Sequence, residues 1–202
     1  MKTALLYGAN EARKRERDVK RRAVKQEKGR PVMRVGRKPG GHTGAFGLLR
    51  IAHFTLPCRL GRSGIVARKC EGDGATPRGR MVLLSGFFRS DRTKRSQLPR
   101  GLRPIKQDDG WCDAPGHACY NRNVTRPFSA SHEHMWRDDR LYDVVLILDW
   151  NLTSRVRGRG SAIFLHVEPD GSNGTQGCIG IEPVLFRRLA PLLKAGLLVD
   201  VL

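Results

Sequence analysis

The pattern of apolar and polar positions divides the chain into a charged beginning and a strand-rich remainder. Residues 11–28 hold four apolar side chains among many charged ones, which predicts a solvated helix or a disordered basic arm rather than a packed element. Pro39-Gly40-Gly41 has the composition of a linker. We therefore expect a basic, disordered or helical leader over residues 1–40 and one folded domain over residues 41–202, with Met33 as an alternative start.

Five apolar, β-rich segments predict the strands of this domain, and Gly-rich turns separate the first three. The fourth is apolar except at Asp143, so it predicts a central strand that is buried on both faces. Their spacing indicates an antiparallel or mixed sheet. The segments are 48–60 (broken at Pro57), 65–70, 81–88, 141–148 and 162–167.

The end of the chain predicts a helix followed by a strand. Pro183 is suited to the first turn of a helix, Gly196 ends it, and residues 197–202 form the final strand. The apolar stripe of the helix is expected to consist of Val184, Leu185, Leu189, Leu192 and Leu193.

Residues 89–140 are polar and irregular, and are too long for a simple loop inside a compact domain. Trp111, Tyr120, Phe128 and Trp136 are distributed along this stretch. These aromatic side chains predict an ordered excursion that packs on the sheet.

Charge narrows the range of partners without choosing one. The net charge is +19, and residues 1–30 carry eleven basic against four acidic side chains, so the domain itself is also basic. This favours anionic partners, but no basic stretch is interleaved with aromatic residues, so no specific nucleic acid is expected. No apolar run is long enough for a membrane span, and the first residues lack the apolar core of a signal peptide.

The best candidate for chemistry is a histidine and a cysteine near the end of the chain. His166 ends an apolar strand, and Cys178 follows twelve residues later, directly behind Gly177. A cysteine nucleophile needs a base and access to its substrate, and the amide of Cys178 with a neighbouring amide could bind an oxyanion. The alternative is a small buried cysteine and a core histidine.

The order of these residues, His before Gly-Cys with an apolar strand before the His, resembles the L,D-transpeptidase catalytic domain (YkuD-like). The resemblance covers most of residues 45–202 and suggests a short bacterial branch of that family. Further segments that carry it are Leu60-Gly-Arg-Ser-Gly64, Gly72-Asp-Gly-Ala-Thr-Pro77, Gly160-Ser-Ala-Ile-Phe-Leu-His166, Trp111-Cys-Asp113, Tyr120-Asn-Arg122 and Ser131-His-Glu133.

The resemblance implies a mainly β fold with a few helices, in which a sandwich or barrel sheet carries a long irregular excursion and a C-terminal helix and strand. It implies a cysteine acyltransferase of cell-wall biogenesis that acts on donor and acceptor peptidoglycan peptide stems through a thioester on Cys178. His166 would give and take the proton, and Gly177 would form the oxyanion corner. It implies no cofactor and no metal, and a periplasmic or cell-envelope location. The alternatives are an L,D-carboxypeptidase-type hydrolase of the same fold and an inactive basic binding protein.

The substrate-binding residues are expected beside this pair. Gln176 stands where the family pattern usually has histidine, and it can still donate a hydrogen bond. Val167 and Gly180 differ from the pattern as well, where glycine and arginine are frequent. Asn121 and Arg122 could line the cleft, with Arg122 meeting a stem carboxylate; alternatively they tie the excursion to the sheet. Glu133 is open to the same two interpretations.

Five cysteines cannot all pair with one another, although Cys112 and Cys119 are close enough in sequence to form a disulfide in an oxidising compartment. Together with His117, His132 and His134 they could supply zinc ligands, but their spacing matches no usual zinc motif. A structural role in the excursion is the preferred interpretation.

Overall fold

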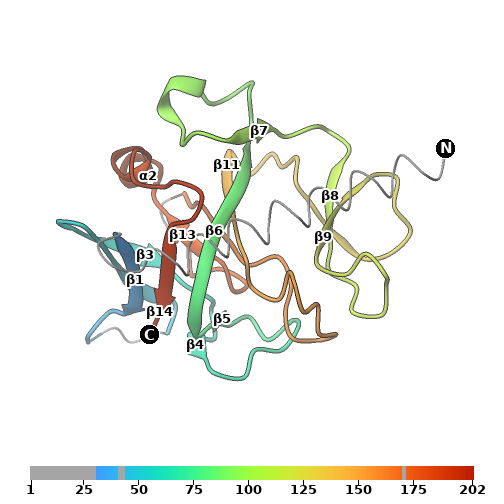
Figure 1. Cartoon of the computed structure of the whole chain (residues 1–202), viewed down its shortest axis with the longest axis horizontal. Helices are drawn as coiled ribbons and strands as arrows, with labels where there is room; N and C mark the ends of the chain where they lie inside the picture. Colours follow the sequence, from blue (N-terminus) through green and yellow to red (C-terminus); the bar gives the residue numbers. More distant parts are fainter. Residues whose placement is uncertain (1–30, 41–43, 170–171) are drawn as a thin grey trace.

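A computed structural model describes residues 31–40, 44–169 and 172–202. The predicted helix or arm at residues 11–28 lies outside the described residues. The main sheet consists of β7 (Leu102–Pro104), which pairs only with β6, and eight further strands (Figure 1). They are β1 (Val32–Arg37), β2 (Phe46–Ile51), β3 (Phe54–Arg59), β6 (Gly79–Phe88), β11 (Val144–Leu148), β12 (Phe164–Val167), β13 (Ile179–Ile181) and β14 (Leu198–Val201).

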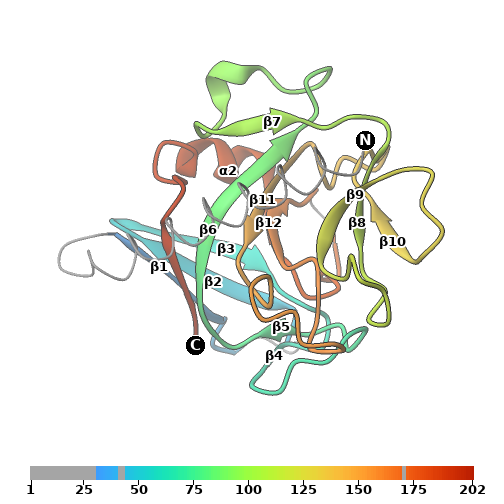
Figure 2. The same cartoon turned by 45° about the vertical axis from the view of Figure 1, so that its right-hand side comes forward.

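The main sheet closes on itself as a barrel. Its strand order is β11-β12-β13-β3-β2-β1-β14-β6, and β6 pairs with β11 as well (Figure 2). The pairs β1–β14, β12–β13 and β6–β7 are parallel and the others are antiparallel, so the sheet is mixed. Closure leaves no free edge along these eight strands. The predicted mainly β barrel is therefore confirmed.

Alternation along the strands fills the barrel with side chains, as in other small barrels. On most strands, every second residue points inward and is buried; on β3 only Cys58 is fully buried. The inward set includes Val35, Leu49, Met81, Leu146, Leu165, Ile179 and Val199, none of which is more than 1% exposed.

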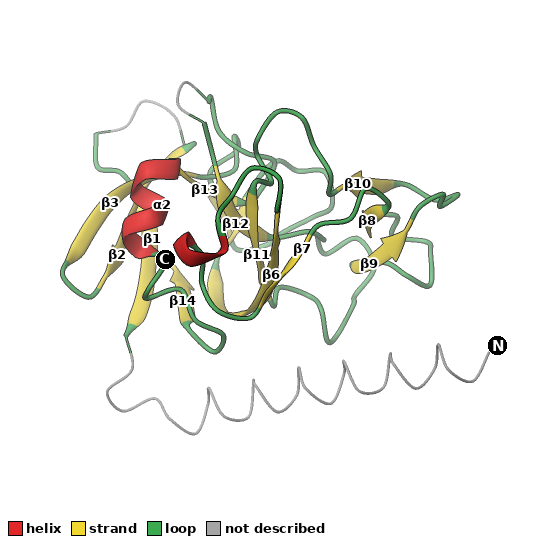
Figure 3. Ribbon diagram, turned by 90° about the horizontal axis from the view of Figure 1, so that it is seen from above, coloured by secondary structure: helices red, strands yellow, loops and turns green. Residues whose placement is uncertain are grey.

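The outer face of β11 and β12 is covered by the predicted excursion. This segment holds η1 (Arg95–Gln97), β7 (Leu102–Pro104), β8 (Asp109–Cys112), β9 (Arg122–Thr125) and β10 (His132–His134). The last three strands form a small antiparallel sheet beside the barrel, away from β1–β3 (Figures 2 and 3).

Aromatic side chains join the excursion to the barrel, as the sequence predicted. Trp111 is buried and packs edge-on against Phe164 of β12, with ring centroids 5.1 Å apart. Tyr142 packs edge-on against the same ring at 6.0 Å. A second apolar cluster therefore lies outside the barrel and includes Met135 and Cys178.

The helix α2 (Pro183–Leu189) begins at the predicted proline. It buries Phe186 and Leu189 against the barrel core, whereas Val184, which was assigned to the apolar stripe, is 52% exposed. That assignment was wrong because successive helical residues are about 100° apart, which turns Val184 away from the side that Phe186 and Leu189 bury. The predicted end at Gly196 was also wrong, since α2 ends at Leu189. The final strand is confirmed as β14.

Three predicted boundaries also differ from the structure. Residues 48–60 are two strands, interrupted by a turn at Ala52 (φ 49°) rather than at Pro57, which lies inside β3. The strand expected at 65–70 is only β4 (Ile65–Val66), which pairs with β5 (Thr76–Pro77). Moreover, β1 lies in the barrel, so the domain includes residues that the sequence analysis assigned to the leader.

Candidate active site

Strand geometry places His166 and Cys178 on the same face of the sheet. In the parallel pair β12–β13, Leu165 lies beside Ile179 and His166 beside Gly180. Leu165 and Ile179 point into the barrel. The alternate residues His166 and Cys178 therefore point outward, toward the excursion. Both line one cavity of about 230 Å³ between the barrel and the excursion.

The Cys178 thiol is a buried, neutral donor in the resting structure. Its sulfur donates to the Ala162 carbonyl at 3.2 Å and accepts the Phe164 amide at 3.4 Å. Burial raises the pKa of the Cys178 thiol to about 12, against the smaller opposing effect of the Phe164 amide. If this sulfur acts as a nucleophile, a base must therefore remove its proton.

The surroundings of His166 fix which ring nitrogen can act as that base. Nδ1 lies 2.8 Å from the Val167 carbonyl, which can only accept a hydrogen bond, so Nδ1 carries the proton. Nε2 is then the free basic nitrogen. Burial lowers the pKa of His166 below its ordinary value, with the Val167 carbonyl and Glu168 acting in the opposite direction. The imidazole is neutral and able to accept a proton at pH 7.

Gly177 forms the sharp corner that presents the cysteine. Its φ is +131°, and a Cβ at this position would lie 2.7 Å from the Ala75 carbonyl oxygen, so only glycine fits. The Gly177 amide donates to Thr175 Oγ1 at 3.1 Å, and the Thr175 hydroxyl donates to the Cys178 carbonyl at 2.7 Å. Because that amide is already bonded, Gly177 shapes the corner, and the Cys178 amide is the better candidate for the oxyanion donor.

Acidic side chains dominate the cavity, although the chain as a whole is strongly basic. The charged residues of the lining are Glu71, Asp113, Glu133, Glu168, Arg62 and Arg137. Three buried oxygens of this lining, Asp113 Oδ1, Ser161 Oγ and Glu168 Oε2, have no hydrogen-bond partner within the described part of the chain. An arrangement of this kind suits a ligand that carries a positive charge or several hydrogen-bond donors.

Of the predicted substrate-binding residues, Gln176 and Glu133 line the cavity, and Asn121 and Arg122 do not. Asn121 is 1% exposed. Its Oδ1 accepts the Ala162 amide at 3.1 Å and Trp111 Nε1 at 3.0 Å, and its Nδ2 donates to the Trp150 carbonyl at 3.0 Å. The alternative interpretation therefore applies to Asn121, because it ties the excursion to the barrel.

Arg122 begins β9, where it lies opposite Cys112 in the small sheet. It is not among the residues that line the cavity. The five cysteines are free, Cys112 and Cys119 included. Within residues 31–40, 44–169 and 172–202, no three histidine, cysteine or acidic side chains are grouped as metal ligands.

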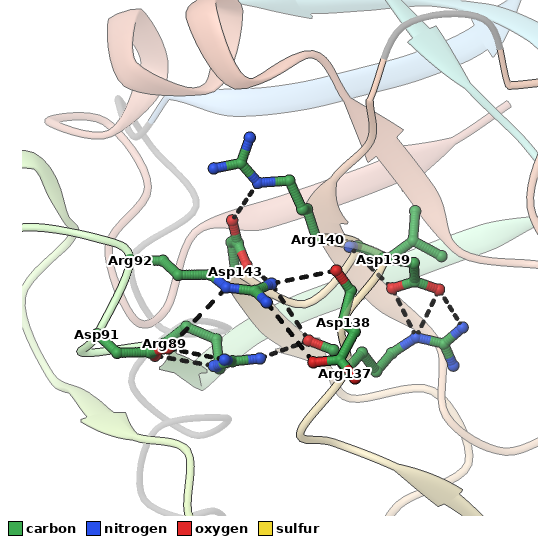
Figure 4. A network of polar contacts seen from close by, with 9 residues as sticks. Arg89, Asp91, Arg92, Arg137, Asp138, Asp139, Arg140 and Asp143 are labelled. Atoms are coloured by element: carbon green, nitrogen blue, oxygen red, sulfur yellow. Dashed lines mark hydrogen bonds and ion pairs between the residues drawn. The ribbon is translucent and has the colours of Figure 1, made fainter.

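A network of arginines and aspartates holds the segment that supplies Arg137 (Figure 4). The buried guanidinium of Arg89 donates to the Arg137 carbonyl, pairs with Asp91 at 2.7 Å and lies 3.7 Å over the Trp136 ring. Arg137 itself pairs with Asp139 and with Glu133. These contacts fix one wall of the cavity.

Several lining residues were not predicted from the sequence. Glu168 follows His166 at an interval of two, which is the strand signal that could have placed it on the same face. Tyr142 lies edge-on to the His166 ring with centroids 5.6 Å apart. Its position depends on how the excursion folds back, and no local pattern reveals that.

Solved L,D-transpeptidases are similar to this chain at low identity. L,D-transpeptidase 1 of Mycobacterium tuberculosis is 12% identical, with a TM-score of 0.37 and 85% of this chain and 62% of that chain covered. An L,D-transpeptidase of Mycobacterium smegmatis is 13% identical, with a TM-score of 0.37 and coverage of 85% and 59%. L,D-transpeptidase 3 of M. tuberculosis, solved with a faropenem-derived adduct, is 13% identical, with a TM-score of 0.37 and coverage of 85% of this chain and 60% of that chain. The chain thus spans about three fifths of their length.

No curated protein matches the chain. The model of the YkuD family, described as the L,D-transpeptidase catalytic domain, matches residues 50–201, which include every strand of the barrel except β1 and part of β2. That match extends over well more than half of the sequence, and it contains both His166 and Cys178. The chain belongs to the L,D-transpeptidase catalytic domain family.

Proposed function

We propose that this protein is an L,D-transpeptidase that acts on peptidoglycan peptide stems through a thioester on Cys178. The observation that carries the proposal is the placement of Cys178 and His166 on one face of adjacent strands, lining one cavity, with Nε2 as the free nitrogen of the ring. This is the minimal arrangement for a cysteine nucleophile with its base.

In the first half of the reaction, His166 Nε2 removes the Cys178 proton while the sulfur attacks the carbonyl carbon of the donor stem. The oxyanion that forms accepts a hydrogen bond from the Cys178 amide, which the Gly177 corner presents. Nε2 then returns the proton to the leaving D-amino acid, whose C–N bond breaks. The acyl group remains on the sulfur as a thioester.

In the second half, an amine of the acceptor stem attacks the thioester carbonyl and His166 Nε2 removes its proton. The C–S bond breaks, and the sulfur recovers the proton to regenerate the thiol that donates to Ala162. The new peptide bond joins donor and acceptor. Every proton passes through Nε2, because Nδ1 stays bonded to the Val167 carbonyl.

The acidic lining of the cavity favours an amine over water as the acceptor. Four carboxylates against two guanidinium groups attract the ammonium group of an acceptor stem, which releases one proton to solvent before its neutral amine attacks. A carboxypeptidase that hands the acyl group to water would gain nothing from this lining. Peptidoglycan peptide stems as the substrate imply a location at the cell envelope. Separately, no helix in the described part of the chain is long and apolar enough to cross a membrane.

The test is a reaction of the purified full chain with a tetrapeptide stem, with and without an added acceptor amine, followed by mass spectrometry. We expect release of the terminal D-amino acid, a transient acyl adduct on the Cys178 peptide and a cross-linked product that needs the amine. Cys178→Ala should abolish all three, and Cys58→Ala, at a second buried cysteine that does not line the cavity, should retain them.

Imipenem supplies an independent probe of the thiol, and its adduct should map to Cys178. Release of the D-amino acid without any cross-linked product would identify the hydrolase instead. Absence of both the acyl adduct and the imipenem adduct would contradict the enzyme and support the inactive binding protein.

A further inference from the structure

A buried carboxylate stands on the far side of the His166 ring from Nε2. Glu168 is the next outward residue after His166 on the β12 segment and is 4% exposed. Its Oε2 lies 3.4 Å from His166 Nδ1. The Glu168 amide donates to the Ile181 carbonyl at 2.8 Å, which continues the pairing of β12 with β13 and fixes the backbone here.

No hydrogen bond from any described residue satisfies Glu168 Oε2. Removing a carboxylate from water costs several kcal/mol unless it gains a partner. A buried, unsatisfied oxygen in a folded protein therefore requires an explanation. The imidazole of His166 is the group within ion-pairing distance, and it becomes a cation during the proposed reaction.

The opposite strand leaves room for this carboxylate. Gly180 lies beside His166 in the β12–β13 pair. A Cβ at residue 180 would lie 2.7 Å from Glu168 Cβ and 2.9 Å from Glu168 Oε2. Any other residue at position 180 would push the Glu168 side chain away from the ring.

Other charged and titratable groups also face the imidazole. Tyr142 lies edge-on to it, and Cys178 shares its face of the sheet. Arg137 opposes a positive charge on His166, and Asp139 favours it from the same segment. Glu133 contacts Tyr142 and Arg137 rather than the ring. Of the acids, Glu168 is the one that reaches Nδ1 directly.

We propose that Glu168 is a positioning residue that stabilises the His166 imidazolium formed when Cys178 gives up its proton. The proposal rests on the proposed function, because the imidazolium forms only if His166 is the base. One proton moves from Sγ to Nε2, Nδ1 keeps its own, and Glu168 receives none. The carboxylate adjoins the imidazole rather than the sulfur, so it lowers the energy of the cation more than it raises that of the thiolate.

The experiment measures two properties of the full chain for wild type, Glu168→Gln and the matched control Glu182→Gln. The first is the pKa of His166, followed by NMR of the imidazole. The second is the rate of Cys178 modification by imipenem, or by iodoacetamide, against pH. Glu182 starts α2 outside the cavity, so its variant should behave as wild type.

In Glu168→Gln we expect the pKa of His166 to fall by about one unit and the plateau rate to fall about tenfold, since one unit corresponds to that factor. The rising acid limb of the rate profile should move to lower pH by the same amount. A purely structural defect would lower the plateau without moving the limb. Gly180→Ala should also lower the pKa of His166 and the plateau rate. When it is combined with Glu168→Gln, the plateau rate should fall by less than a further twofold.

An unchanged His166 pKa in Glu168→Gln would overturn the proposal, whatever the rates. A lowered plateau with an unmoved acid limb would overturn it as well. If the pKa moves but wild type forms neither an imipenem adduct nor a stem adduct, the proposed function fails while the coupling of Glu168 to His166 stands. The two failures are therefore distinguishable.

Discussion

Asn121 shows how a residue outside the cavity can control atoms inside it. Its side chain accepts the Ala162 amide, and the carbonyl of the same Ala162 accepts the Cys178 thiol. Asn121 has φ +55° and Ala162 has φ +51°, two strained positions that need support. If Asn121 contacts substrate, removing its side chain should weaken binding. If it ties the excursion to the barrel, removing it should lower the stability of the fold.

We expect Asn121→Ala to lower the free energy of unfolding by about 3 kcal/mol, because it leaves Trp111 Nε1, the Ala162 amide and the Trp150 carbonyl without their buried partner. Urea unfolding measures this change. Asn121→Asp keeps the acceptor but turns an oxygen toward the Trp150 carbonyl and buries a charge, so it should cost at least as much. A variant that binds substrate more weakly but unfolds like wild type would restore the substrate-binding role that the sequence suggested.

At the residue scale, the sequence identified the pair His166 and Cys178 because order, spacing and the Gly177 corner are local features. It could not separate Asn121 from Gln176, since residue type does not reveal burial. Asn121 is 1% exposed, whereas Gln176 is exposed and lines the cavity. The alternation of side chains along a strand could have placed Glu168 on the same face as His166. Its closeness to the imidazole, however, depends on Gly180 in the neighbouring strand.

At the scale of elements, the excursion depends on a carboxylate at the start of β8. Asp109 is 6% exposed and binds the Arg103 guanidinium with both oxygens, at 2.7 and 2.8 Å. It also accepts the Lys106 amide at 2.7 Å. Burial alone would raise the pKa of Asp109, but these bonds outweigh it and hold the pKa below its ordinary value.

Because the pKa of Asp109 is lower in the folded chain, its contribution to stability is present above the unfolded pKa of about 3.9 and is lost as the pH falls through the folded value. Asp109→Asn should therefore cost about 1–3 kcal/mol near pH 7. The difference from wild type should narrow in strong acid. Urea midpoints against pH measure this, with the exposed Asp108→Asn as the matched control. A gap that stays constant with pH would contradict the ionic explanation.

Element types were easier to predict than their boundaries and partners. The strands β6, β11 and β14 and the start of α2 follow from apolar runs and one proline. The hairpin turn at Ala52 carries no Gly or Asn signal, so the sequence placed the break at Pro57 instead. Likewise β1 was assigned to the leader, because its partner β14 lies at the other end of the chain.

At the scale of the whole molecule, barrel closure brings the cavity together. It depends on the β6–β11 and β1–β14 pairs, which join segments far apart in sequence. Local sequence patterns do not reveal such distant strand pairs. The expectation of a sandwich or barrel sheet came from the family resemblance instead. Closure also sets an acidic cavity into a chain of net charge +19. The surface and the cavity therefore attract different parts of a substrate.

This separation predicts different salt dependences for the two kinds of binding. Adsorption of the full chain to purified, acidic peptidoglycan should be strong at about 50 mM salt and largely lost at about 500 mM, since exposed charges are screened over a Debye length. Acylation of Cys178 by imipenem occurs in a buried cavity and should change by less than about twofold over that range, because buried charges are screened much less. Cosedimentation and adduct formation measure the two. Adsorption that survives high salt would show that the basic surface does not recruit the polymer. If salt lowers adsorption and acylation equally, the salt effect lies in the cavity.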